Sequence, residues 1–135
     1  MTAFALDPRL AADTREIVSL PLCAARLMND RRFPWVVLIP ARPNLSEIID
    51  LDAADRGRLI EEIALVSDAL RDLFQPTKLN VGALGNVVPQ LHVHVVARFA
   101  NDAAWPGPVW GTRAEPYPLD EQARRLAQLR ERLSR

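Results

Sequence analysis

The segment from Leu51 to Phe74 constrains the fold most, because it is the longest stretch of the chain with helical periodicity. Its apolar positions, spaced three and four residues apart, are Leu59, Ile63, Val66, Leu70 and Phe74. A stripe of this kind predicts a helix that buries one face. Asp52 is a favourable N-cap residue, and Pro76 stops the helix. The chain must therefore supply an apolar surface for this helix to cover.

Short strand patterns lie on both sides of this helix. Strands are predicted over 16–20, 22–28, 35–40, 77–84 and 90–99, with an irregular or short helical lead-in over 6–14 and a second helix over 119–133. The run from Trp35 to Pro40 is apolar throughout, which indicates burial on both faces. Short loops between neighbouring strands favour antiparallel pairing. We therefore predict an α+β fold, in which the main helix packs on one face of an antiparallel sheet.

The length and charge balance restrict the class of protein. A chain of 135 residues is predicted to form a single domain over 1–135, with its core at about 16–99 and a tryptophan-bearing loop and helix over 100–135. Lys and Arg number 17, as do Asp and Glu, so the net charge is zero. This balance argues against a general nucleic-acid binder, yet it permits a small phosphate ligand.

The cysteine content and hydropathy indicate the compartment. Cys23 is the single cysteine, which excludes an intrachain disulfide and a thiolate metal cluster. No apolar run approaches the ~20 residues that span a bilayer, and the N-terminal sequence lacks the pattern of a secretory signal. We therefore expect a cytoplasmic protein without a membrane partner.

Both histidines of the chain lie two residues apart in PQLHVHVVAR, residues 89–98. In a strand, Gln90, His92 and His94 share one face at ~7 Å spacing. The residues that face the core instead are Leu91, Val93 and Val95. Imidazoles held in this way can act as nucleophile or as general acid and base. Two other interpretations remain open: solvent-facing residues without a task, and a metal site completed by carboxylates.

A glycine-containing loop, NVGALGNVVPQ, leads into the histidines. Gly82 and Gly85 allow backbone N–H groups to approach a ligand and point inward, as phosphate-binding loops require. An ordinary hairpin would also explain the glycines. Beside paired imidazoles, the loop indicates a phosphate pocket next to a nucleophile.

The segment QLHVHVV resembles the signature of the histidine triad superfamily, with Gln90 at the first of the three histidine positions. WVVLIP followed by ARP, LSEIIDL and LNVGALG resemble further segments of that family, so the resemblance covers roughly Leu22 to Arg98. It implies a five-stranded antiparallel sheet with two helices, usually as a homodimer. It also implies a nucleotide substrate that is hydrolysed or transferred at its α-phosphate, with no required cofactor beyond Mg²⁺ that can accompany the nucleotide.

The resemblance also implies roles for individual residues. His92 matches the family's nucleophile, which forms a nucleotidyl-histidine intermediate, and His94 matches a hydrogen-bonding partner of the phosphate. A neutral imidazole splits one difficult displacement into two easier steps, and a backbone carbonyl from Gln90 would fix its tautomer. The matches for nucleotide contacts are the phosphate loop at Gly85, Asn86 and Val87, a polar phosphate neighbour at Asn80 and a ribose-binding residue at Asn29.

Two departures from the family pattern affect the expected chemistry. Gln90 cannot titrate, so a proton relay through the first position is absent. Trp35 stands where many members carry a further histidine, and we interpret it as a core or groove aromatic. We expect a nucleotidyl hydrolase or transferase that acts on a dinucleoside polyphosphate or a nucleoside phosphoramidate, with no metal site. The alternatives are a nucleotide-binding or sensing module without turnover, and a metal-dependent hydrolase.

Overall fold

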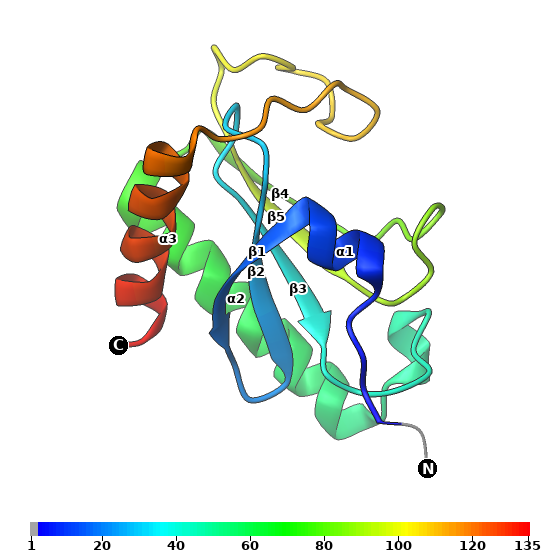
Figure 1. Ribbon diagram of the computed structural model, residues 1–135. Coiled ribbons are helices and arrows are strands. Elements are labelled where there is room, and N and C mark those ends of the chain that lie inside the picture. Colours follow the sequence, from blue (N-terminus) through cyan, green and yellow to red (C-terminus); the bar gives the residue numbers. More distant parts are fainter. Residues whose placement is uncertain (1–2) are drawn as a thin grey trace.

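The computed structural model describes residues 3–135 as a five-stranded sheet with helices on both sides (Figure 1). In chain order the elements are α1 (Pro8–Asp13), β1 (Thr14–Ser19), β2 (Cys23–Met28), β3 (Trp35–Pro40), a 3-10 turn (Ile48–Asp50), α2 (Ala53–Phe74), β4 (Lys78–Gly82), β5 (Val93–Arg98) and α3 (Leu119–Leu133). This arrangement confirms the predicted α+β class.

The sheet has the strand order β1-β2-β3-β5-β4, and every neighbouring pair is antiparallel. β3 lies at its centre, with all six residues buried, which confirms burial on both faces. The register places Trp35 opposite Val96 and Val37 opposite His94. The central strand therefore lies directly beside the histidine strand.

Helix α2 begins and ends where its local chemistry requires. The Asp52 side chain accepts a hydrogen bond from the Asp55 N–H at 2.8 Å, which satisfies one free donor of the first turn. Gln75 takes the left-handed conformation, with φ of 49°, and its N–H closes the last turn on Arg71. Pro76 follows and cannot extend the helix. The helix observed is thus the one that the apolar stripe predicts.

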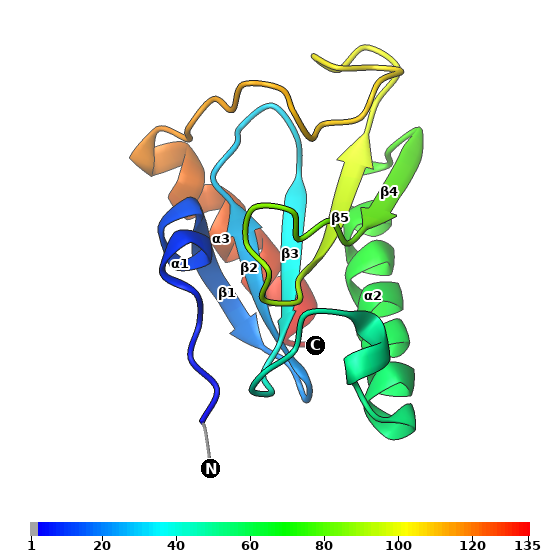
Figure 2. The ribbon, with the colours of Figure 1, turned by 90° about the vertical axis from the view of Figure 1, so that its right-hand side faces the viewer.

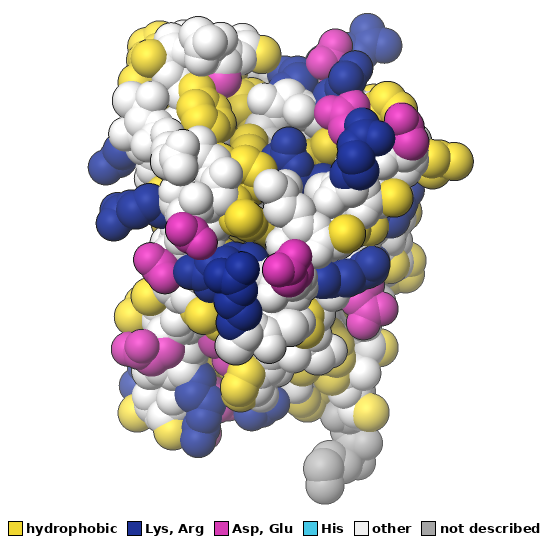
Figure 3. Space-filling view, turned by 90° about the vertical axis from the view of Figure 1, so that its left-hand side faces the viewer, with side chains coloured by type: hydrophobic (Ala, Val, Ile, Leu, Met, Phe, Trp, Pro, Cys, Tyr) yellow, Lys and Arg dark blue, Asp and Glu magenta, His cyan; other side chains and the backbone are white. Residues whose placement is uncertain are grey.

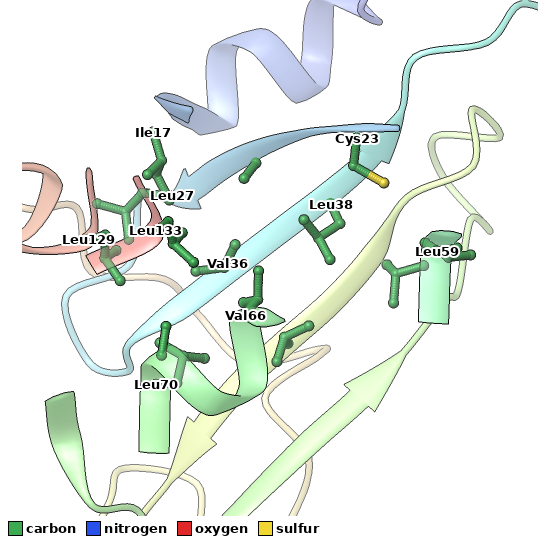
Figure 4. Close-up of a cluster of buried hydrophobic side chains, with 14 of the residues drawn as sticks. Ile17, Cys23, Leu27, Val36, Leu38, Leu59, Val66, Leu70, Leu129 and Leu133 are labelled. Atoms are coloured by element: carbon green, nitrogen blue, oxygen red, sulfur yellow. The ribbon is translucent and has the colours of Figure 1, made fainter. Parts of the chain in front are cut away.

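The larger core lies between the sheet and the pair α2 and α3. Alternate residues of β3 point to this side, and apolar side chains of both helices cover them. Figure 4 labels members of this cluster from several elements: Val36, Leu38, Val66, Leu70, Leu129 and Leu133. Because α2 and α3 occupy this face, the opposite face of the sheet is left for other segments.

A smaller apolar cluster covers the opposite face. It contains Trp35, Val37 and Ile39 of β3 together with Leu10 of α1 and Val109 of the C-terminal loop. In Figure 2 this face is turned to the viewer, and the segment between β4 and β5 crosses it in yellow-green beside α1. The loops that surround the histidines thus lie on the face without the long helices.

The last strand is shorter than predicted. β5 begins at Val93 rather than at Gln90, and β4 ends at Gly82. Pro89 has no N–H to donate to a neighbouring strand, and the Leu91 N–H donates instead to the Leu45 carbonyl at 3.0 Å. The chain from 83 to 92 therefore leaves the sheet and forms a loop, and His92 lies at the end of this loop.

The surface over the helices differs from the histidine face. Figure 3 shows that side, with Lys, Arg, Asp and Glu side chains interspersed and neither histidine in view. On α3, Leu126, Leu129 and Leu133 are buried against the chain's own core, whereas Leu119 is exposed. Within residues 3–135 no helix combines the length and the apolar character that crossing a bilayer needs.

Candidate active site

The two histidines meet on the loop-covered face of the sheet. Their rings lie 5.0 Å apart between centroids and meet edge to face, with His92 just before β5 and His94 within it. Both side chains are buried, with exposed fractions of 7% and 5%. The residues that alternate with them, Leu91, Val93 and Val95, belong to the core beneath α2 and α3. The predicted alternation of faces is therefore confirmed.

The backbone fixes the tautomer of His92. Its Nδ1 lies 2.7 Å from the Gln90 carbonyl oxygen. A carbonyl oxygen can only accept, so Nδ1 carries a proton, and in the neutral form of the ring Nε2 keeps its lone pair. Within residues 3–135, Nε2 has no protein partner. In that form the ring presents the lone pair of Nε2, which can act as a nucleophile.

His94 has the opposite arrangement. The Trp35 Nε1–H donates to His94 Nδ1 at 3.0 Å. An indole nitrogen can only donate, so His94 Nδ1 is unprotonated and Nε2 carries the proton. Burial, and then the nearby His92, lower the pKa of His94 to about 4. His94 is therefore neutral near pH 7 and presents an N–H donor.

A cavity of about 450 Å³ opens beside both rings. Its lining includes the loop from Gly85 to Val88, α1 residues Arg9, Leu10 and Asp13, the acid Asp30, and the aromatic residues Trp35 and Trp110. A second cavity of about 300 Å³ lies next to it, between the segment 46–49 and Leu84, and His92 borders both. His92 is thus placed where two parts of one ligand could diverge.

The loop from Gly85 to Val87 has the properties of an anion-binding loop. Gly85 has φ of +71°, a conformation that strains any residue with a Cβ atom. Within residues 3–135, the N–H groups of Gly85, Asn86 and Val87 find no acceptor. Unpartnered backbone donors beside a cavity are suited to phosphate oxygens. The loop lines the cavity beside the histidines, and phosphate binding by the loop stays a prediction.

Gln90 has a different position from the one predicted. Its Oε1 accepts from the Asp7 N–H and its Nε2 donates to the Ala5 carbonyl, each at 2.8 Å. The side chain therefore holds the N-terminal segment that leads into α1, and it does not line either cavity. Its backbone carbonyl, by contrast, contacts His92 directly.

Asn29 and Asn80 are not brought into the cavity. The Asn29 side-chain oxygen accepts from the Tyr117 N–H at 3.0 Å, and so ties the end of β2 to the C-terminal segment. The Asn80 oxygen accepts from Arg98 at 2.8 Å. Arg98 is itself buried and paired with Asp102, which organises the loop after β5. The structure thus gives both asparagines structural contacts.

Several cavity residues were missed by the sequence reasoning. Asp30 is buried and lines the cavity, although it sits next to the predicted Asn29. Trp110 packs edge to face on His94, with 5.5 Å between the ring centroids, and its ring also lies close to Gly82. The turn at Asn29 and Asp30 and the tryptophan-bearing loop were visible in the sequence, but nothing local indicated which residue would face the histidines.

Among residues 3–135, no three His, Cys, Asp or Glu side chains come together as a set of metal ligands. Cys23 is buried beneath α2, and burial followed by the nearby Glu62 carboxylate raises the pKa of its thiol far above the ordinary value. Such a thiol is a poor nucleophile.

Comparison with known proteins identifies the family. Residues 9–101 match the family model of the HIT domain. A histidine triad protein from Bradyrhizobium japonicum is 44% identical, with 98% of this chain and 99% of that chain covered and a TM-score of 0.94. Histidine triad proteins from Sinorhizobium meliloti (47% identical, 96% of each chain, TM-score 0.92) and Marinobacter aquaeolei (43%, 98% of each chain, TM-score 0.95) are similar to the same extent. No curated protein matched the chain. With a family model over most of its length and close structural relatives, the chain belongs to the HIT domain family of histidine triad proteins.

Proposed function

We propose that this protein is a nucleotidyl hydrolase or transferase that forms a covalent intermediate between His92 and the α-phosphate of a nucleotide. The observation that carries the proposal is the hydrogen bond from His92 Nδ1 to the Gln90 carbonyl, because it leaves Nε2 as a lone-pair nitrogen. Membership of the HIT domain family supports the reaction class.

In the first step, the Nε2 lone pair of His92 forms a bond to phosphorus while the bond to the leaving group breaks. The leaving group departs with the electron pair of that bond. The ring becomes positively charged, and its Nδ1–H remains bound to the Gln90 carbonyl, which stabilises the charge. In the second step water, or another acceptor, attacks phosphorus and the N–P bond breaks, so that its electron pair returns to Nε2 and restores the neutral ring. The proton of the attacking water or acceptor is released to solvent.

The surrounding donors stabilise the phosphoryl group as charge develops on its oxygens. The free N–H groups of Gly85, Asn86 and Val87 and the Nε2–H of His94 provide these donors. Fixed dipoles in a buried site are effective because they need no reorganisation during the reaction. We also propose that the contact to ribose predicted for Asn29 is made by Asp30, since Asp30 lines the cavity.

The substrate class follows from the lack of a proton donor for the leaving group. We propose that Gln90 occupies the place of the first histidine of the family motif, and its amide cannot supply a proton. Leaving groups that depart as stable anions, such as the phosphate chain of a dinucleoside polyphosphate, should therefore react faster than the alkyl amine of a phosphoramidate.

The test is steady-state turnover of a panel of dinucleoside polyphosphates and nucleoside phosphoramidates, with and without EDTA. We expect turnover in EDTA, and loss of kcat by on the order of 10⁴-fold or more in His92→Ala, with nucleotide binding retained. Ile60→Ala, an exposed change on the helix face, is the matched control and should leave turnover unchanged. Near wild-type turnover in His92→Ala would overturn the mechanism. Tight nucleotide binding without turnover of any substrate would identify a nucleotide-binding module, and activity lost on metal stripping would identify a metal-dependent hydrolase.

A further inference from the structure

We propose that Trp35 is a positioning residue that sets the tautomer of His94, so that His94 presents a permanent Nε2–H donor and cannot act as the acid for the leaving group. The identity of the group that receives this N–H rests on the proposed function. The tautomer itself is a property of the protein and can be measured without a substrate.

The direction of the hydrogen bond between the two rings is not ambiguous. The Trp35 Nε1 and His94 Nδ1 atoms are 3.0 Å apart. Because the indole nitrogen has a proton and no available lone pair, His94 Nδ1 must be the acceptor. The alternative tautomer, with a proton on Nδ1, would place two N–H groups against each other in a buried site. The cost of leaving both donors unsatisfied selects the Nε2–H form.

The sheet holds the Trp35 and His94 rings in the geometry of this hydrogen bond. Trp35 begins β3 and pairs with Val96, while His94 pairs with the next outward-facing residue of β3, Val37. Trp35 is 6% exposed and His94 is 5% exposed, so little solvent competes for the hydrogen bond. The interplanar angle of 61° directs the edge of the indole at the imidazole. The donor is therefore fixed by the same register that builds the sheet.

A second tryptophan shows that packing against His94 does not by itself fix the tautomer of His94. Trp110 lies on His94 at the same centroid distance as Trp35, 5.5 Å, with an interplanar angle of 69°. Its Nε1 is buried and finds no acceptor among residues 3–135. Trp110 thus packs against His94 without bonding to it, and Trp35 alone of this pair controls its protonation.

The protonation state of His94 limits the chemistry of the site. Burial and His92 lower the pKa of His94 to about 4, and the bond from Trp35 favours the same neutral form. The other charged groups that line the cavity are Arg9, Asp13 and Asp30. A neutral imidazole can donate a hydrogen bond to a phosphoryl oxygen, yet it has no acidic proton to give to a leaving group. Leaving groups must therefore depart unprotonated or obtain a proton from water.

The experiment measures the tautomers of both histidines by two-bond ¹H–¹⁵N NMR as a function of pH. In the wild-type protein we expect opposite tautomers, Nδ1–H for His92 and Nε2–H for His94. In Trp35→Phe, which keeps an aromatic ring and removes the donor, His94 should become a mixture of tautomers and titrate at a higher pH. Trp110→Phe is the matched control, and the tautomer of His94 should not change in it.

Site-specific replacement of Trp35 by benzothienylalanine exchanges the N–H for sulfur with little change of shape, and it tests the same point if Trp35→Phe does not fold. With substrate, kcat should fall about tenfold in either variant while KM changes less, as expected for one lost hydrogen bond to the phosphoryl group. An Nε2–H tautomer that persists in both variants would overturn the inference. If the wild-type tautomers are fixed and change when the donor is lost, but the protein turns over no substrate, the inference is supported and the proposed function fails.

Discussion

His92 and His94 each make one hydrogen bond of a kind that the other lacks, and these hydrogen bonds give the two rings different chemistry. A backbone carbonyl accepts from one ring, and an indole N–H donates to the other. The neutral form of the first ring therefore presents a lone pair at Nε2 and the second ring presents an N–H there, although the ring centroids are only 5.0 Å apart. At the scale of single residues, the neighbours of the histidines decide which ring atom donates a hydrogen bond and which can accept one.

The depressed pKa of His94 predicts a pH-dependent stability. An unfolded histidine titrates near its ordinary value of 6.5, whereas His94 in the fold titrates at about 4. The unfolded state therefore binds more protons between these values, and stability present above pH 6.5 is lost as the pH falls toward 4, by about 3 kcal/mol in total. Urea unfolding across this range should give a shallower pH slope for His94→Gln than for the wild type. Parallel curves would show that His94 is not held neutral.

Gln90 is predicted to act by holding the N-terminal segment. Gln90→Glu keeps the acceptor for the Asp7 N–H but loses the donor to the Ala5 carbonyl. Because the segment leads into α1, which lines the cavity, KM should rise with little change in kcat, equally for good and poor leaving groups. Kinetics on a dinucleoside polyphosphate and an alkyl phosphoramidate provide the check. An effect on kcat that depended on the leaving group would give Gln90 a part in proton transfer.

At the scale of elements, the loop before β5 makes the site. It leaves the sheet after Gly82, turns at Gly85 with positive φ, and returns at Val93. The residues of this turn line the cavity together with His92 and His94.

Gly85→Ala tests the loop directly. A Cβ atom at this φ costs about 1 kcal/mol, and relief of the strain should turn the amides away from the ligand. We expect nucleotide binding to weaken about tenfold, the equivalent of one hydrogen bond. Gly57→Ala is the control, since a Cβ atom there meets nothing within 4 Å, and it should leave binding unchanged. Calorimetric titration with a nucleoside monophosphate measures the affinity of both variants. Unchanged affinity in Gly85→Ala would remove the loop from the site.

The elements that the sequence predicts well are those set by local patterns. α2, β3 and α3 follow from the apolar stripe, the continuous apolar run and the seven-residue spacing of Leu119, Leu126 and Leu133, each a matter of neighbours along the chain. The start of β5 was wrong by three residues, because it depends on where Leu91 finds an acceptor in a distant segment.

In the candidate site, too, local patterns predict some features, while others depend on residues far away in the sequence. The facing of His92 and His94 follows from alternation along one segment, and it is confirmed. Gln90 and Asn29 accept backbone hydrogen bonds from residues 83 and 88 positions away in the chain, so no local pattern indicates these contacts. The hydrogen bond from Trp35 to His94 likewise depends on the pairing of β3 with β5. The sequence predicted that the two histidines share a face, and it gave no sign of the distant contacts that set their hydrogen bonding.

For the whole molecule, homodimerisation stays a prediction. The leucine stripe of α3 does not argue for it, because Leu126, Leu129 and Leu133 are buried against the chain's own core. The edge strand β4 does present unpaired backbone groups, and Val81 on it is 48% exposed. Light scattering at micromolar concentration should give twice the chain mass of 15.1 kDa. A mass equal to one chain would contradict the prediction.

In the whole molecule, the two faces of the sheet carry different parts of the structure. The helix face carries the main core, and the opposite face holds the loop, α1 and the two tryptophans around the histidines. The central claim is that His92 Nε2 becomes covalently bound to phosphorus. This claim is independent of which base or leaving group the natural substrate carries.

The most direct measurement is a rapid-quench reaction with a nucleotide that has a good leaving group, followed by mass spectrometry of the intact chain and of its peptides under alkaline conditions that preserve N–P bonds. The account predicts a chain heavier by one nucleotidyl group, with the added mass on the peptide that contains His92, and no added mass in His92→Gln. Turnover with the nucleotidyl group on another residue, or wild-type turnover in His92→Gln, would contradict it.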